Sequence, residues 1–208
     1  NLSTIEAVDI TKEFTYPEEK HTFHEFVYVD NGNIHCHLEE RDIELTQGVT
    51  VPADKTFTLD LNGKTITGTP TVAAEFAVIT NNGNLTITDN TEAKEGKILC
   101  NHNLAPSTGY AVNTITNNGT LTIEAGTIEN KSTYTSSNQI GYAIDNNSTT
   151  GNAVVTIKGG NVTASGSTYY DGIRQFCNST TLENSVTIEG GEVSTLWIQN
   201  PSNDNEKD

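Results

Sequence analysis

The stretch Leu121-Thr-Ile-Glu-Ala-Gly-Thr-Ile128 decides the fold, because variants of the same phrase return along the chain. Its strand triplet ends on an aliphatic residue at five places: Leu61, Ile87, Ile123, Ile157 and Ile188. The intervals between these positions (61 to 87, to 123, to 157, to 188) are 26, 36, 34 and 31 residues. A repeat of this length, rich in β-formers and punctuated by glycine and asparagine, indicates a solenoid.

Each repeat is predicted to contain three short strands. In the central triplet, represented by Leu121-Thr-Ile123, the two aliphatic side chains face inward and the threonine faces outward. The second strand opens five residues later, after a bend in which glycine tolerates positive φ. The third strand precedes the triplet and ends in an asparagine cluster, whose amides can bond one another from coil to coil. The bend glycines are Gly96, Gly126, Gly160 and Gly191, and the third strands cover 76–79, 110–115, 142–144 and 171–176.

Three strands per repeat predict an all-β chain folded as a parallel β-helix of about five coils, with neighbouring coils ~4.8 Å apart. A β-sandwich also uses many short strands, but it does not require one phrase to return in the same order. Two outward columns are expected: Asp60, Thr86, Thr122, Thr156 and Thr187 in one, and Thr88, Glu124, Lys158 and Glu189 in the next.

The chain divides into three parts. Residues 1–42 lack the repeat, and 26–29 and 34–38 flank an Asn-Gly turn, so we expect a β-hairpin that caps the open end of the solenoid. Residues 43–199 are assigned to the β-helix. Residues 200–208 are polar and are expected to form a disordered tail or a linker.

Composition excludes several partners. The net charge is −16, from 11 basic and 27 acidic residues, which argues against nucleic acid and anionic lipid. No run approaches the ~20 apolar residues of a membrane helix, so no membrane insertion is expected. The chain contains no methionine and begins at Asn1, which is typical of a mature or trimmed product. Cys36, Cys100 and Cys177 are odd in number and far apart, so they form no disulfide framework.

The phrase at 55–66, followed by Asn-Asn-Gly-Asn-Leu-Thr-Ile87, resembles secreted bacterial surface proteins of the pectate-lyase-like right-handed β-helix superfamily. The resemblance covers residues 43–198. It implies a right-handed parallel β-helix that is secreted or held at the cell surface. Because that superfamily includes polysaccharide lyases, glycoside hydrolases and adhesin-like proteins, the fold alone does not choose among activities.

Catalysis is not expected, and no catalytic residue is assigned. Glycoside hydrolysis needs clustered carboxylates, whereas the outward acidic residues, including Asp60 and Asp89, are scattered or lie beside a lysine. Arg174 is the only arginine in the coils, and Asp171 lies three residues before it. We expect a structural ion pair in a loop there, since such pairs are common. A lyase or hydrolase acting near these two residues remains the alternative.

Four histidines lie close together in the sequence: His21, His24, His35 and His37. A His-X-His strand with a third histidine nearby can hold zinc, but this spacing is loose. We prefer the simpler explanation, in which these histidines lie on the polar, exposed face of the capping hairpin. We assign no metal and no cofactor.

Insertions at 67–75, 99–109, 129–141 and 163–170 are predicted to emerge on one side of the solenoid. Tyr134, Tyr169 and Tyr170 lie in these polar segments and, with Asp171 and Arg174, form the candidate binding face. Exposed tyrosine rings stack on sugars, while polar side chains bond hydroxyl groups. We therefore expect adhesion, or recognition of a neutral glycan or a cell-surface protein. A passive spacer is a further alternative. Tyr110 and Tyr142 are expected to stack internally, at equivalent positions.

Overall fold

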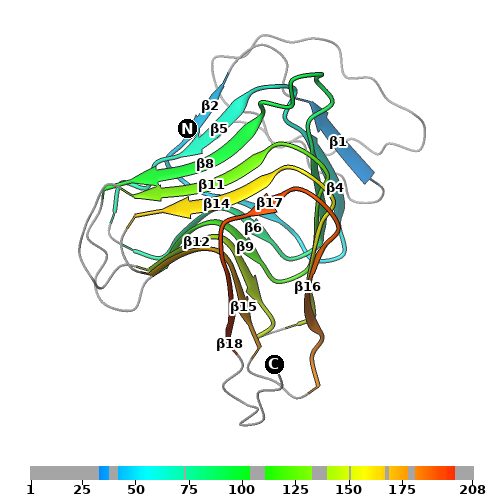
Figure 1. Cartoon of the computed structure of the whole chain (residues 1–208), viewed down its shortest axis with the longest axis vertical. Helices are drawn as coiled ribbons and strands as arrows, with labels where there is room; N and C mark the ends of the chain where they lie inside the picture. Colours follow the sequence, from blue (N-terminus) through cyan, green and yellow to red (C-terminus); the bar gives the residue numbers. More distant parts are fainter. Residues whose placement is uncertain are drawn as a thin grey trace, which may run out of the picture.

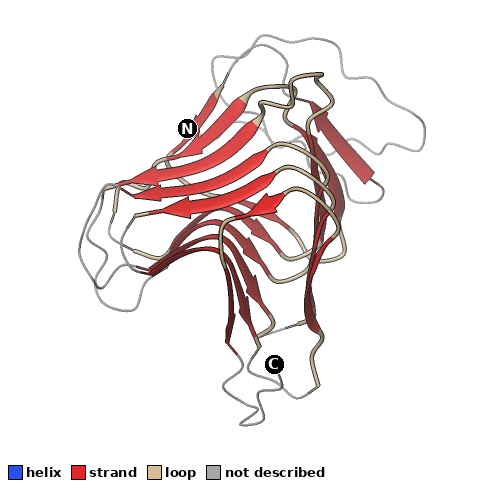
Figure 2. Cartoon of the chain, viewed as in Figure 1, coloured by secondary structure: helices blue, strands red, loops and turns tan. Residues whose placement is uncertain are grey.

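The computed structural model describes residues 33–37, 42–72, 74–103, 111–132, 140–149, 151–166, 169–177 and 181–199, and the side chains of 33–37 and 169–170 fall outside the description. All regular elements in these ranges are strands (Figure 2). They form three parallel six-stranded sheets, here named A, B and C, that wrap around one interior (Figure 1).

Every third strand along the chain joins the same sheet, so one coil consists of three strands. Sheet A contains β1 (Asn33–His37), β4 (Thr56–Asp60), β7 (Asn84–Thr88), β10 (Thr120–Ile123), β13 (Ala153–Ile157) and β16 (Asn184–Ile188). Sheet B contains β2 (Ile43–Leu45), β5 (Thr65–Gly68), β8 (Lys97–His102), β11 (Thr127–Ser132), β14 (Asn161–Ser165) and β17 (Glu192–Val193). Sheet C contains β3 (Val49–Val51), β6 (Phe76–Asn81), β9 (Val112–Asn117), β12 (Ile140–Asn147), β15 (Tyr169–Phe176) and β18 (Leu196–Gln199). The predicted parallel β-helix of about five coils is confirmed, and the sandwich alternative is wrong.

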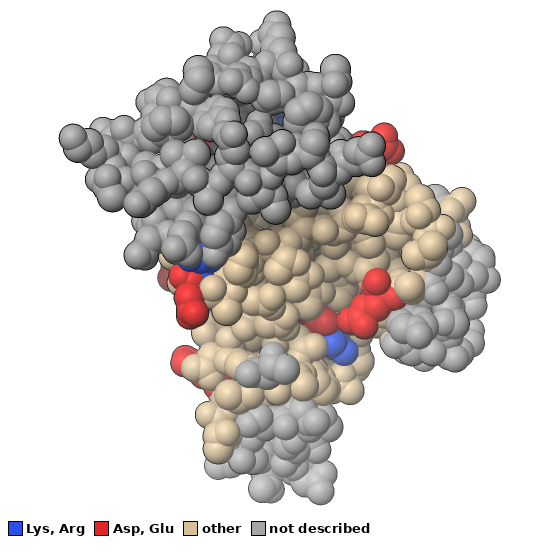
Figure 3. Space-filling view, turned by 180° about the vertical axis from the view of Figure 1, so that it is seen from behind, with Lys and Arg blue, Asp and Glu red and all other residues tan. Residues whose placement is uncertain are grey.

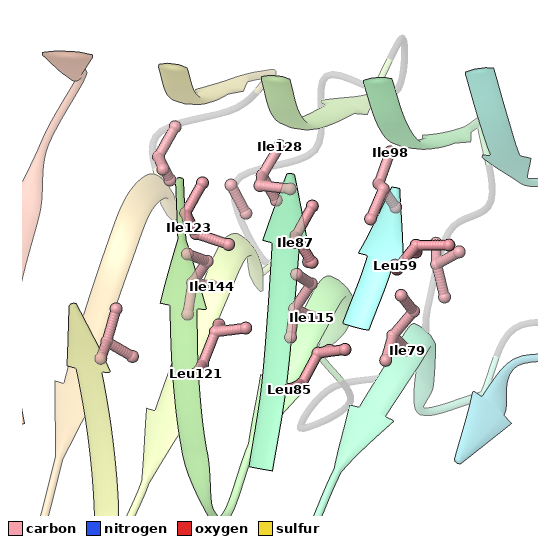
Figure 4. Packing of buried hydrophobic residues seen from close by; sticks show 14 of the residues in the cluster. Leu59, Ile79, Leu85, Ile87, Ile98, Ile115, Leu121, Ile123, Ile128 and Ile144 are labelled. Atoms are coloured by element: carbon pink, nitrogen blue, oxygen red, sulfur yellow. The ribbon is translucent and has the colours of Figure 1, made fainter. Parts of the chain in front are cut away.

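Aliphatic side chains fill the interior in columns that run from coil to coil (Figure 4). Ile87, Ile123 and Ile157 form the column of sheet A and are completely buried. Sheet C contributes a second column that includes Ile115 and Ile144. Burying one such side chain stabilises the fold by about 1.5–3 kcal/mol, so these columns are the main favourable contribution to folding.

The register of the first triplet differs from the sequence alignment by two residues. Phe57 lies opposite Leu85, and Leu59 lies opposite Ile87. Consequently Thr58 begins the outward threonine column, and Asp60 lies beside Thr88 instead. A shift of two residues leaves every side chain on the same face, so the in-and-out pattern alone could not detect the error. In the neighbouring column, Lys158 pairs with Glu124 at 3.6 Å as expected.

Three of the four predicted bend glycines have positive φ: Gly126 at 92°, and Gly160 and Gly191 at 80°. The prediction is wrong for Gly96, because the longer connection in that coil takes its left-handed residue at Lys94. Glycine is still required at 96 for space. An added Cβ would lie 2.5 Å from the Leu61 side chain and 2.5 Å from the Asp89 carboxylate.

The predicted amide ladder is present at the corner between sheets C and A. The Asn81 amide donates to the Asn117 side chain at 2.7 Å, and Asn117 donates to Asn146 at 2.8 Å. Asn146 then donates to Asn184 at 3.4 Å, while its register partner in the next coil is Gln175. The Asn178 cluster lies outside the described residues. The ladder thus supplies hydrogen-bond partners to the buried asparagine amides of the coils that it joins, and buried polar groups need such partners.

The N-terminal segment enters the solenoid at β1, which pairs in parallel with β4 and forms the end strand of sheet A. Residues 26–29, the other arm of the predicted hairpin, lie outside the described residues, as does the tail at 200–208. The capping role of 1–42 therefore stays a prediction.

Replacing Asn117 by alanine should destabilise the protein by about 2–3 kcal/mol, because it removes the acceptor of one Asn81 amide bond and leaves the buried Asn146 Oδ1 without its donor. Asn118→Ala is the matched control, since its bond to Asn82 is exposed and should matter by less than about 0.5 kcal/mol. Urea unfolding followed by circular dichroism measures both. Equal losses in the two variants would contradict a structural role for the ladder.

Candidate functional site

The outer face of sheet C carries a buried ion pair that joins two coils. Arg174 in β15 lies opposite Asp145 in β12. Its Nε lies 2.7 Å from Oδ1 of Asp145, and its Nη2 lies 2.8 Å from Oδ2. Both groups are withdrawn from solvent, with exposed side-chain fractions of 18% and 5%. The expected loop ion pair with Asp171 is wrong: Arg174 lies in a strand and pairs with the neighbouring coil.

Aromatic rings surround this guanidinium. Its central carbon lies 4.8 Å from the ring centroid of Tyr142 and 5.0 Å from that of Phe176. Trp197, opposite Arg174 in the next coil, lies with its ring centroid 6.1 Å from that of Tyr142. Cation–π contacts of this kind hold the arginine in one orientation and add to the ion pair.

Tyr142 and Asp145 are three residues apart but both contact Arg174, so they share one face. Ala143 and Ile144 between them are both completely buried and belong to the hydrophobic core, so the alternation of inward and outward side chains is interrupted within β12. This interruption accounts for the shared contact of Tyr142 and Asp145 with Arg174. Asn113 extends it into the preceding coil, with its amide 3.4 Å from the Asp145 carboxylate and 3.1 Å from the Thr116 hydroxyl.

Burial and neighbouring charge determine the protonation states of Asp145, Arg174 and Tyr142. Burial raises the pKa of Asp145, and the Arg174 guanidinium opposes that shift. Burial alone would lower the pKa of Arg174, but hydrogen bonding and attraction to Asp145 raise it above its usual value. Burial also raises the pKa of Tyr142 to about 12. The pair is thus a fixed, internally neutral unit, and neither member is available as a free acid or base.

The residues selected from sequence lie partly at this site. Asp171 lies opposite Tyr142 and is half-exposed. Tyr169 and Tyr170 open β15, where their backbones pair with Ile140 and Gly141, and their side chains lie outside the description. Tyr134 also lies outside the described residues.

Sequence reasoning missed Asp145, Phe176 and Trp197. The signal was present, because aligning Ile144 with Ile173 places Asp145 directly beside Arg174. Tyr142 is buried as expected, with 1% of its surface exposed. Tyr110 itself lies outside the described residues. The expected equivalence of Tyr142 with position 110 is wrong, because the bridge between Ala111 and Ile140 aligns Tyr142 with Asn113.

Other reactive side chains are structural in the described ranges. Cys100 and Cys177 are buried, and burial raises the pKa of Cys100 to about 12. His102, at the end of β8, is 4% exposed, and burial lowers its pKa to about 4. Among the described residues, no three histidine, cysteine or acidic side chains are grouped to hold a metal ion. His21 and His24 lie outside the description, as do the side chains of β1.

On the face drawn in Figure 3, acidic atoms are scattered among uncharged ones and basic atoms are few. This agrees with the net charge of −16. Within the described residues, no helix is long and apolar enough to cross a membrane.

The fold places the chain in the class of parallel β-solenoids. No protein-family model, curated protein or solved structure matches it. The β-helix implied by the resemblance to pectate-lyase-like proteins is present, whereas no relative supports membership of that superfamily.

Asp145→Ala should destabilise the protein by about 3–5 kcal/mol, because it leaves the Arg174 guanidinium buried and unpaired. The double variant Asp145→Leu/Arg174→Leu should lose much less, since it removes both charges together. Chemical unfolding at neutral pH measures the unfolding free energies of the unchanged protein, the single variant and the double variant. A double variant as unstable as the single one would show that packing, not charge burial, governs this position.

Stability should fall on mild acidification because of His102. Its folded pKa of about 4 lies below its ordinary value of 6.5, so the unfolded chain binds the proton more tightly. The contribution of His102 to stability is complete above pH 6.5 and is lost as pH falls toward 4, by about 3 kcal/mol in total. His102→Gln should flatten the unfolding free energy over this window. An unchanged pH profile in that variant would contradict the assignment.

Proposed function

We propose that this chain is a non-catalytic recognition β-helix, secreted or displayed at a cell surface, that binds a neutral glycan on the outer face of sheet C. The observation that carries the proposal is the fixed Asp145–Arg174 pair framed by aromatic side chains. Trp197 is 39% exposed and Phe176 is half-exposed, so both rings can meet a ligand. Rings and directed polar groups held rigidly together are typical of sugar-binding sites.

Charge favours an uncharged ligand. Arg174 is neutralised by Asp145. The half-exposed Asp171, opposite Tyr142 in the register, offers a carboxylate that can accept hydrogen bonds from hydroxyl groups. The net charge of −16 repels acidic polysaccharides. A neutral glycan therefore fits better than pectate-like or sulfated polymers. Adhesion would follow if the glycan belongs to a neighbouring cell or matrix.

The rival proposal is a polysaccharide lyase or glycoside hydrolase acting near Asp171 and Arg174. Hydrolysis requires one carboxyl as acid and another as base or nucleophile. Asp145 is 3% exposed and accepts two bonds from Arg174, so it is unsuited to either role. Arg174 is equally unsuited as a base, because Asp145 raises its pKa. A passive spacer, the third possibility, would give these side chains no ligand.

The test is binding to a broad array of bacterial, plant and host glycans, with and without calcium, followed by titration of each hit. Asp171→Ala should weaken binding by about tenfold or more, since a hydrogen bond to a charged group contributes about 1.5–3 kcal/mol. Lys158→Ala is the control and should bind normally, because Lys158 follows β13 of sheet A and pairs with Glu124, away from sheet C.

Two results would overturn the proposal. Cleavage of a hit glycan that disappears in Arg174→Ala would establish the enzyme instead. An array without hits, or binding that survives both Asp171→Ala and Trp197→Ala, would remove this face as the glycan site. A protein ligand or a spacer would then take its place.

A further inference from the structure

A polar group interrupts the aliphatic interior where the neighbouring strands β8 and β11 end (Figure 1). Residues two apart on a strand share a face, and the buried residues of β8 after Ile98 are Cys100 and His102. The buried residues at the same places in β11 are Asn130 and Ser132. The register sets Cys100 opposite Asn130 and His102 opposite Ser132. Sulfur, nitrogen and oxygen donors therefore gather on one inward-facing area of sheet B.

The side chain of Asn130 points to a ligand in this group. It is completely buried, and its Nδ2 donates to the backbone oxygens of Val112 at 2.7 Å and Tyr142 at 3.1 Å. These two bonds hold the amide in one orientation. Among the described residues, its Oδ1 has no hydrogen-bond partner. Because buried oxygens are normally bonded, this atom is available to a ligand beside Cys100.

The donors around this oxygen suit a soft metal ion. Cys100 and His102 lie two residues apart on one face of β8, so a thiol and an imidazole border the same part of the interior. Thiolate and imidazole are protein ligands that copper(I) and zinc prefer. An ordered water would satisfy the Asn130 oxygen, whereas a metal ion engages the sulfur and the nitrogen as well.

Charge decides between the two metal ions. A metal-bound cysteine is a thiolate, whereas histidine and asparagine ligands are neutral, so this set carries one negative charge. Copper(I) gives a neutral site, but zinc(II) leaves one positive charge in the interior, where an unpaired charge is costly. Glu129 is the carboxylate that β11 offers, and it faces outward and pairs with Lys97 at 2.8 Å. The donor set therefore favours the monovalent ion.

We propose that Cys100, His102 and the Oδ1 atom of Asn130 form a buried structural site for one copper(I) ion. When the ion binds, the Cys100 thiol releases its proton to solvent and a sulfur–copper bond forms, with no change in oxidation state. The ion links β8 to β11 from within the solenoid and gives the Asn130 oxygen its partner. This site lies inside sheet B, so it does not depend on the glycan proposed for the outer face of sheet C.

The test uses the chain with Cys36→Ser and Cys177→Ser, in which Cys100 is the single remaining thiol. The protein is refolded without oxygen in the presence of copper(I), because Cys100 and Asn130 are completely buried once the coils have formed. One copper(I) per chain should stay bound in competition with bicinchoninate. X-ray absorption should show sulfur and an imidazole nitrogen around the metal. Zinc(II) binding that depends on Cys100 should be at least about a hundredfold weaker.

The matched control carries Cys36→Ser and Cys100→Ser but keeps Cys177, a buried cysteine at another place in the chain. It should bind copper(I) at least about a hundredfold more weakly. His102→Gln keeps the Cys100 thiol and should remove the imidazole signal from the absorption spectrum. Circular dichroism checks that each variant folds. If the double serine variant does not fold, the unchanged chain and its Cys100→Ser variant give the same comparison by difference.

Three results would overturn the proposal. A folded chain that retains no copper(I) would leave the Asn130 oxygen to water. Equal copper(I) binding by the Cys177 control, or an imidazole signal that survives His102→Gln, would place the metal elsewhere. Zinc(II) bound through Cys100 as tightly as copper(I) would contradict the charge argument on which the choice of ion rests.

Discussion

The hydrogen-bonded ladder between successive coils is the constraint on which the rest of the structure depends. Because the strands are parallel and in register, each residue lies directly beside its counterpart in the next coil. One choice of side chain is therefore repeated as a column. An aliphatic residue at an inward position builds the core, and an asparagine at the corner builds the amide ladder. The same rule places residues about 30 positions apart in sequence into direct contact, as the separation of 29 between Asp145 and Arg174 shows.

This constraint also explains where function is encoded. The outward column of sheet A consists of threonine in every coil from Thr58 to Thr187. This uniform column reports the alignment of the strands and little else. The corresponding column of sheet C changes in its last coils, where Asp145, Arg174 and Trp197 follow Thr116. Departures from the repeat are therefore more informative than the repeat itself. A side chain that breaks its column has a role which stacking alone does not explain.

The fold was predicted well from the sequence because the inward aliphatic residues recur at regular spacing. The triplets, most bends and the corner asparagines could all be read from spacing. The first coil was misaligned because Leu59 and Leu61 are two residues apart and both buried, so either fits the alternation. The partner of Arg174 was missed for a different reason. Attention to neighbours along the strand selected Asp171, although in a solenoid the nearest side chain belongs to the adjacent coil. The exposure of the terminal coil could not be predicted either, because an inward position is buried only where another coil or a partner covers it.

The side and the end of the solenoid differ in how completely their strands are paired. The Asp145–Arg174 site lies on the side of the coils, where the strands pair with neighbours on both sides. Its rigidity comes from burial: a desolvated ion pair is tolerated only with near-ideal geometry, and the short bonds between these two residues provide it. The terminal coil instead presents an incomplete ladder and uncovered columns. Such an edge is a hazard unless something occupies it, and natural sheets protect their edges with charge. Glu183, Glu189 and Glu192 place such charge on the last coil.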